Sequence, residues 1–194
     1  MRRAPARTKE ATHERILDAA ARAIRRSGYA GTSVADIMKE AGLTHGGFYA
    51  HFASREAMLA EAADRAGAES VSASTRIAAA APPEQAVKQI MLAYLSKEHL
   101  RNAEMGCPVA ALGSEMPRQA PEVRRAATLR IKEMIDVVAR HLPDWGQAGA
   151  HERALVMVST MVGTLLLARA VDDSKLSDAL LESALKHFIP PTSH

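Results

Sequence analysis

Residues 33–52, with the sequence SVADIMKEAGLTHGGFYAHF, decide the fold of this chain. Ser33 is a favourable helix N-cap, and Asp36, three positions later, can complete a capping box. Apolar residues then recur with the i, i+3, i+4, i+7 spacing of one buried helix face, at Val34, Ile37, Met38 and Ala41. Gly42 follows, at the position where the end of a helix favours a residue with positive φ. These signals predict a short helix that ends in a tight turn.

The residues after this turn predict a second short helix over 45–50. Leu43 is the apolar residue that anchors the turn, and Thr44 can cap the helix that follows. The second helix contains Gly46 and Gly47, although each glycine costs about 1 kcal/mol relative to alanine in a helix interior. Glycines on an exposed face let the backbone approach a partner closely. The two short helices therefore predict a helix-turn-helix.

A helix-turn-helix places the start of its second helix in the DNA major groove, while other parts grip the phosphates. The residues that we expect to face base edges are Thr44, His45, Gly46 and Gly47. Tyr49 and His51 can donate hydrogen bonds to phosphate oxygens. The alternative interpretation is a compact helical hairpin that packs and has no further role.

A wider set of residues extends this pattern, namely Gly31, Thr32, Ser33, Val34, Ile37, Ala41, Gly42, Leu43, Thr44, Gly46, Phe48, Tyr49, Ala50, His51, Phe52, Arg55 and Glu56. The set closely resembles the DNA-binding domain of the TetR family of transcriptional regulators, over the first quarter to third of the chain. The resemblance implies a homodimer with an N-terminal three-helix DNA-binding domain and a helical C-terminal domain that binds an effector. The DNA contacts that it implies fall on Thr32, Ser33, Thr44, His45, Gly46, Gly47, Tyr49, His51 and Arg55.

Composition favours an all-α fold. The 194 residues are 47% hydrophobic and only 4% aromatic, and alanine and leucine, which favour helix over sheet, are plentiful. Periodicity predicts about nine helices, the longer ones from between residues 8 and 12 to 27, and over 54–77, 83–98, 121–142, 148–171 and 174–189. We therefore expect a helix-turn-helix DNA-binding domain over 1–53 and a helical ligand-binding and dimerisation domain over 54–194.

Charge is distributed unevenly along the chain. Residues 1–55 contain ten Lys/Arg and five Asp/Glu residues, whereas the remainder contains fifteen and seventeen. A basic head on a mildly acidic body fits a polyanion-binding module, so the predicted partner is double-stranded operator DNA. Residues 1–9 are expected to form a basic arm that lies on phosphates or in a minor groove, or else a solubilising tail. A non-specific architectural DNA-binding protein is the alternative function.

Cysteine usage and hydropathy favour a cytoplasmic protein without a membrane partner. The single cysteine, Cys107, allows no intrachain disulfide and suits a reducing compartment. The N-terminus lacks the apolar segment of a secretory signal. The most apolar run, over 154–168, is interrupted by serine, threonine and glycine and is too short to span a membrane.

The same apolar run predicts a subunit interface. A helix that is apolar on nearly all sides must be buried on all sides, and a body of this size cannot surround it alone. We expect the helices over 148–171 and 174–189 to pack against their copies in a second subunit as a four-helix interface. The predicted interface residues are Val162, Leu166, Leu176 and Leu180.

The effector is expected to be an unknown small molecule that binds inside the body. Methionine adapts to ligands of varied shape, and aromatic residues often line such sites. The expected wall residues are Met91, Tyr94, Met105, Met116, Trp145, Met157 and Met161. Each of them is better explained as ordinary core when it is taken alone.

Cys107 is a further candidate for the effector site. It lies between Gly106 and Pro108 at the start of a predicted short helix, and helix N-termini raise the thiolate fraction of a cysteine. The segment GCPVAA over 106–111 resembles the Gly-Cys segment of some TetR-family regulators that respond to electrophiles or oxidants. The alternative is a buried and inert small hydrophobe.

No pattern indicates catalysis, a cofactor or a metal. A phosphate-binding glycine loop would need a preceding strand, and no nucleophile elbow occurs. His99, Glu104 and Cys107 could gather a metal, but no second cysteine supports that interpretation. We therefore expect a regulator, most simply a repressor, with a helical small-molecule enzyme as the remaining alternative.

Overall fold

The structure, a computed structural model, describes residues 5–189, and these residues form helices and no strand. The head contains α1 (Pro5–Ser27), α2 (Val34–Glu40) and the 3-10 helix η1 (His45–Ala50). The body contains α3 (Arg55–Ala80), η2 (Pro83–Gln85), α4 (Ala86–Tyr94), α5 (Lys97–Arg101), α6 (Pro108–Leu112), η3 (Met116–Arg118), α7 (Pro121–Arg140), α8 (Ala150–Ala170) and α9 (Ser174–Phe188). The predicted all-α class is confirmed.

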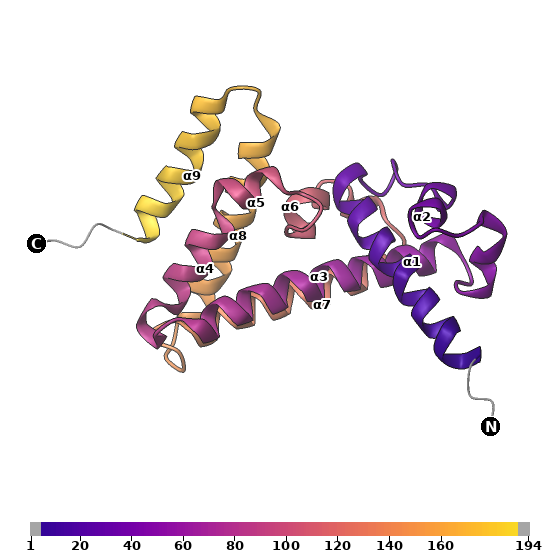
Figure 1. Cartoon of the computed structure of the whole chain (residues 1–194). Coiled ribbons are helices and arrows are strands. Elements are labelled where there is room, and N and C mark those ends of the chain that lie inside the picture. Colours follow the sequence, from indigo (N-terminus) through magenta and orange to yellow (C-terminus); the bar gives the residue numbers. More distant parts are fainter. Residues whose placement is uncertain (1–4, 190–194) are drawn as a thin grey trace, which may run out of the picture.

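Two long helices connect the parts of the molecule. α3 and α7 run side by side from the head to the far end of the body (Figure 1). α4, α5 and α6 fill the space beside α8 (Figure 1). α8 and α9 form a hairpin on the side of the molecule remote from α1 and α2, so the expected interface helices lie away from the DNA-binding head (Figure 1).

Local signals set the helix-turn-helix as the sequence predicts. The Ser33 hydroxyl accepts the backbone N–H of Asp36 at 3.1 Å and caps α2. Gly42 adopts a φ of +71° in the turn, a conformation that strains any residue with a Cβ. The predicted side-chain cap at Thr44 is wrong, because Thr44 makes no capping hydrogen bond, and the helix that follows is a 3-10 helix. The second helix is therefore wound more tightly than an α-helix.

The first helix starts earlier than the sequence pattern predicts. α1 begins at Pro5 rather than between residues 8 and 12, because proline suits the first turn of a helix. The expected basic arm over 1–9 is thus helical from its fifth residue, and residues 1–4 lie outside the described part of the chain.

The single helix expected over 83–98 is also corrected. It divides into η2, α4 and α5, and α4 ends at Tyr94. The hydroxyl of Ser96 accepts the backbone N–H of His99 at 3.1 Å and caps a new helix. A serine cap competes with helix continuation at this position, and the apolar spacing alone did not reveal it.

Apolar side chains gather in two clusters that share α3. The head cluster joins α1, α2 and η1 to the first half of α3, as far as Ala63, and includes Leu112 and Val123 from the body. The body cluster joins the second half of α3 to α4, α7, α8 and α9. Because α3 contributes to both cores, it connects the head to the body. The expected boundary after residue 53 stays a prediction.

α8 leaves part of its apolar surface uncovered in the single chain. Leu155, Val156 and Leu167 are exposed, and Val156 retains 58% of its surface. By length and composition alone α8 could cross a membrane, but a core helix passes the same test. Apolar side chains exposed in this way fit the predicted packing of α8 against a second subunit, which stays a prediction.

Candidate DNA-binding face and effector cavity

The start of η1 forms an open face of the head. Thr44, His45 and Gly46 are exposed, and Gly47 is half-buried. Tyr49 projects from the same short helix with 73% of its surface exposed, whereas Phe48 is only 1% exposed. Phe48 therefore anchors η1 in the head core while its neighbours face outward.

The fold itself requires neither glycine of η1. Both have ordinary negative φ angles. A Cβ added at Gly46 would meet no atom within 4 Å, and one at Gly47 would meet only Met38 Cε, at 3.6 Å. By contrast, a Cβ at Gly67 would lie 2.5 Å from Arg130, so that glycine serves packing. Gly46 and Gly47 are explained by a partner that approaches the backbone from outside.

Other residues expected to contact DNA make hydrogen bonds inside the head. The Thr32 hydroxyl donates to the Gly28 carbonyl at 2.6 Å, and Ser33 caps α2. Arg55 Nη2 donates to the carbonyl of Tyr29 at 2.5 Å and to that of Thr32 at 3.0 Å. These bonds hold the turn that leads into α2. The DNA contacts of these residues stay predictions.

His51 lies beside a second histidine, and their ring centroids are 6.2 Å apart. Burial, with the charges of His13 and Lys9, lowers the pKa of His51, so its imidazole is neutral at pH 7. Its Nδ1 is buried and has no hydrogen-bond partner in the described part of the chain. A neutral imidazole still has one N–H donor, so the predicted phosphate contact would be an uncharged one.

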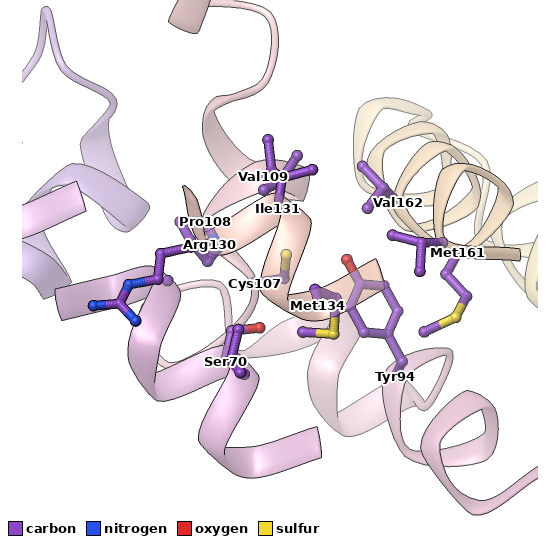
Figure 2. A pocket seen from close by; sticks show the side chains of 13 residues that line it. Ser70, Tyr94, Cys107, Pro108, Val109, Arg130, Ile131, Met134, Met161 and Val162 are labelled. Carbon is purple, nitrogen blue, oxygen red and sulfur yellow. The ribbon is translucent and has the colours of Figure 1, made fainter. Parts of the chain in front are cut away.

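Two cavities meet at Cys107 inside the body. One of about 40 Å³ lies between α3, α7 and α8 (Figure 2), and another of about 210 Å³ lies between α3, α4 and α5. Ser70, Tyr94 and Cys107 line both cavities. That an effector binds in either cavity stays a prediction.

Cys107, His99 and Tyr94 form one hydrogen-bonded unit. The backbone N–H of Cys107 donates to Nε2 of His99 at 2.9 Å, and Nδ1–H of His99 donates to the Tyr94 carbonyl at 2.7 Å. These two bonds select the neutral His99 tautomer with its proton on Nδ1. The Tyr94 ring also packs edge-on against the imidazole, with centroids 4.7 Å apart. The cysteine backbone is therefore held from α4 and α5.

Arg169 of α8 closes this unit from the other side, and sequence reasoning missed it. Its Nη2 donates to the His99 carbonyl at 2.6 Å and its Nε to the Leu100 carbonyl at 3.1 Å. Burial lowers the pKa of Arg169, and the charges of Tyr94 and Cys107 oppose that shift. The guanidinium is thus within electrostatic reach of the thiol. The dipole of α6 is small, because that helix has only five residues.

The other expected effector residues are dispersed. Met161 lines the smaller cavity, and Met105, which is largely exposed, lines the larger one. Met91 and Met157 are buried in the body core but line neither cavity. Met116 packs against the head core, and Trp145 is half-exposed in the loop between α7 and α8. Helical spacing alone could not separate cavity walls from solid core.

Arg25 joins the head to the body, a role that its position near the end of α1 did not reveal. It is 3% exposed, and its Nη1 donates to the Gly106 carbonyl at 3.3 Å. Its Nη2 donates to Glu69 of α3 at 2.7 Å. The neighbouring Arg26 reaches Glu104 at 3.2 Å. The segment immediately before Cys107 is therefore bonded directly to the DNA-binding head.

Acid is expected to destabilise the protein through His99. Burial is the main cause that lowers the pKa of His99, so the folded chain binds fewer protons than the unfolded chain below about pH 6.5. The stability that neutral His99 contributes is present above that pH and is lost as the pH falls toward the folded pKa. Urea unfolding at about pH 7.5 and 5.5 measures this loss, which should be smaller in His99→Gln. Equal losses in both proteins would contradict the assignment.

The described residues contain no group of three or more His, Cys, Asp or Glu residues that could hold a metal ion. His99, Glu104 and Cys107 are not gathered around a common point. Nε2 of His99 already accepts the Cys107 N–H, and Glu104 pairs with Arg26.

Two protein-family models match the chain. The model for bacterial regulatory proteins of the tetR family matches residues 16–62, and the model for the C-terminal domain of LmrA/YxaF-like transcriptional regulators matches residues 83–181. The first match covers the second half of α1, the helix-turn-helix and the start of α3. The second covers most of the body.

Relatives are similar over most of their length. An HTH-type transcriptional regulator of Mycobacterium tuberculosis is 31% identical over 177 residues, which cover 82% of this chain and 85% of the relative. The HTH-type transcriptional regulator LmrA of Bacillus subtilis is 28% identical over 168 residues, covering 84% and 89%. The fold is similar to that of reduced Escherichia coli NemR, with a TM-score of 0.74, coverage of 91% and 94%, and 20% identity.

Proposed function

The chain belongs to the TetR family of transcriptional regulators, and from this premise we propose that it is a homodimeric repressor released from its operator by an effector. Two heads occupy successive major grooves of a palindromic operator. An effector bound in the body favours a distance between the two heads that no longer matches the spacing of these grooves. The effector must bind the two spacings with different affinities, because otherwise no population shifts. The protein acts in the cytoplasm, without a cofactor or catalytic activity.

The observation that carries the DNA-binding half of this proposal is the exposed start of η1. Its two glycines have room for side chains within the chain itself, and a close external partner explains why side chains are absent. The excess of positive charge over residues 1–55 supports a polyanionic partner. Thr44 and His45 lead the helix and are assigned to base edges.

Substitution of Arg55 tests whether this residue binds the phosphate backbone of DNA. Arg55→Ala is expected to weaken binding to all DNA sequences about equally and to reduce the slope of log affinity against log salt by roughly one unit. Titrations at several salt concentrations, with operator and with unrelated DNA, measure both effects. Because Arg55 also bonds the carbonyls of Tyr29 and Thr32, the melting temperature is recorded in parallel. A loss confined to one base position would contradict a phosphate contact.

The effector half of the proposal rests on the cavities that meet at Cys107. Electrophiles or oxidants that reach Cys107 add bulk or polarity at a wall shared by both cavities. The preceding residue, Gly106, bonds to Arg25 of the head, so displacement of this segment changes the head orientation. With one cysteine per chain, the product is an adduct, a sulfenic acid, a mixed disulfide or a link to another chain.

Selection of bound sequences from random DNA tests the regulator assignment. A palindromic motif is expected, whereas equal recovery of all sequences would favour an architectural protein. The selected operator is then bound to wild-type protein and to Cys107→Ser, and N-ethylmaleimide is added. Release from the wild type alone is expected. Equal release from both proteins would show that Cys107 is not the trigger, and a non-covalent effector would remain.

A further inference from the structure

Tyr94 places a buried hydroxyl group beside Cys107. The residue is 6% exposed, and its hydroxyl has no hydrogen-bond partner within the described residues. Burial is the main cause that raises the pKa of Tyr94 well above its ordinary value, and the charge and closeness of the Cys107 thiol add to the shift, although the thiol does not reach hydrogen-bonding geometry with the hydroxyl. The hydroxyl is therefore protonated and able to donate. Figure 2 shows it pointing into the cavity beside the Cys107 sulfur.

The rest of this cavity offers mainly apolar walls, contributed by Val71, Ile131, Met134, Val158, Met161 and Val162. Arg130 also lines it, but its guanidinium is engaged by Asp64 and Glu133 at 2.8 Å. A buried donor without a partner is unfavourable for folding, because it has lost water and gained nothing. Such a group is expected where a ligand supplies the acceptor.

The geometry points to a ligand class, namely small apolar α,β-unsaturated carbonyl compounds whose oxygen accepts a hydrogen bond from Tyr94 while the β-carbon faces Cys107. The inference rests on the proposed effector function and specifies its chemistry. The apolar walls contact the hydrocarbon part of the ligand. The Tyr94 hydroxyl donates a hydrogen bond to its carbonyl oxygen, and the Cys107 thiol is the nucleophile. Tyr94 is thus the residue that selects conjugated carbonyl compounds among electrophiles.

The reaction is a conjugate addition in which no oxidant or reductant takes part. The thiol loses its proton to water in the adjoining cavity, and the sulfur forms a bond to the β-carbon. The carbon–carbon π bond breaks, and its electron pair moves toward the carbonyl oxygen, which becomes an enolate. A proton then returns to the α-carbon and yields a thioether. The hydrogen bond from Tyr94 strengthens as negative charge develops on the oxygen.

The neighbouring groups fit this assignment of roles. Nε2 of His99 accepts the Cys107 backbone N–H, so its lone pair is not available as the base for the thiol. The charge of Arg169 partly opposes the rise in the pKa of Tyr94 that burial causes. Nη1 of Arg169 also lacks a partner in the described chain but does not line this cavity, so Tyr94 is the lining residue with an unused buried donor.

The test compares two reagents on the full-length protein in the absence of DNA. The reagents are 2-cyclohexen-1-one, a conjugated ketone, and iodoethane, which alkylates thiols and has no carbonyl oxygen. Intact-protein mass spectrometry gives the rate of adduct formation, and the single cysteine makes each adduct site-specific. Tyr94→Phe should lower the rate of adduct formation with the enone by on the order of tenfold and leave the rate with iodoethane nearly unchanged. Cys107→Ser should form neither adduct.

Stability provides a second readout that separates recognition from structure. Tyr94→Phe removes a hydroxyl without a partner, so its melting temperature should be equal to or above that of the wild type. Equal enone rates in wild type and Tyr94→Phe would overturn the inference, as would equal slowing with both reagents or no enone adduct at all. Faster enone addition to the wild type, without operator release, would instead support the inference and defeat the proposed electrophile response.

Discussion

Gly47→Val is expected to reduce operator affinity to that for unrelated DNA, a loss of roughly a thousandfold or more. The isopropyl group would stand between the η1 backbone and the floor of the major groove. The fold should survive, because a Cβ at Gly47 meets only the flexible end of Met38, at 3.6 Å, and the backbone φ is ordinary. A change in stability of about 1 kcal/mol or less is expected, because Gly47 is half-buried and only the flexible end of Met38 lies near the added atoms.

Fluorescence anisotropy with labelled operator and thermal unfolding measure the two quantities separately. Gly46→Ala adds one methyl group in open space and should cause an intermediate loss of affinity. Ala148→Val, in the exposed loop between α7 and α8, adds a similar bulk far from the head and should bind normally. If Gly47→Val keeps full affinity, this glycine does not face DNA, and the assignment of η1 to the groove fails.

Replacing Val156 and Leu167 together by glutamate is expected to convert the dimer into monomers and to abolish operator binding. Both side chains are exposed in the single chain, so the monomer can tolerate the charges. The predicted packing of α8 on its copy would bury them. An uncompensated buried charge costs about 3–5 kcal/mol, which is a hundredfold or more in the dissociation constant for each charge. Leu166 and Leu180 are already half-buried, so glutamate at either position would also disturb the monomer.

Light scattering coupled to size exclusion determines the mass of the double variant, and circular dichroism determines whether its helices persist. Leu129→Glu on α7 is the matched control, because Leu129 is similarly exposed, at 50% of its surface, but lies outside the predicted interface. It should remain dimeric. A folded dimer of the double variant would refute the α8 interface, whereas dissociation of the Leu129 variant alone would move the interface to α7.

The contacts around Arg25 explain how the cavity and the head can communicate. Arg25 bonds Gly106, which precedes the cavity residue Cys107, and also Glu69 in the middle of α3. Movement of the segment before Cys107 cannot occur without altering a bond to α1. The two ends of this connection are a buried guanidinium and a backbone carbonyl, so small displacements are costly.

The sequence by itself determined the helix-turn-helix, its class and its outward-facing residues. The Ser33 cap, the left-handed Gly42 and the apolar spacing of α2 depend on atoms within four residues of each other. Interactions of that range are written directly in residue order. Local patterns misled the prediction at Ser96. The apolar spacing continues past this residue, although its hydroxyl caps a new helix.

Only the tertiary structure decided which side chains meet in the body and at its joint with the head. Gly106 is 81 residues from Arg25, Leu100 is 69 residues from Arg169, and Tyr29 is 26 residues from Arg55. No local pattern marks such pairs, because periodicity states which face of a helix is apolar and not which helix covers it. For the same reason the sequence placed seven side chains in one pocket, of which Tyr94, Met105 and Met161 line the cavities beside Cys107. The packing of α3, α4, α7 and α8 leaves space at these three residues, and within the described residues it leaves the Tyr94 hydroxyl without a hydrogen-bond partner.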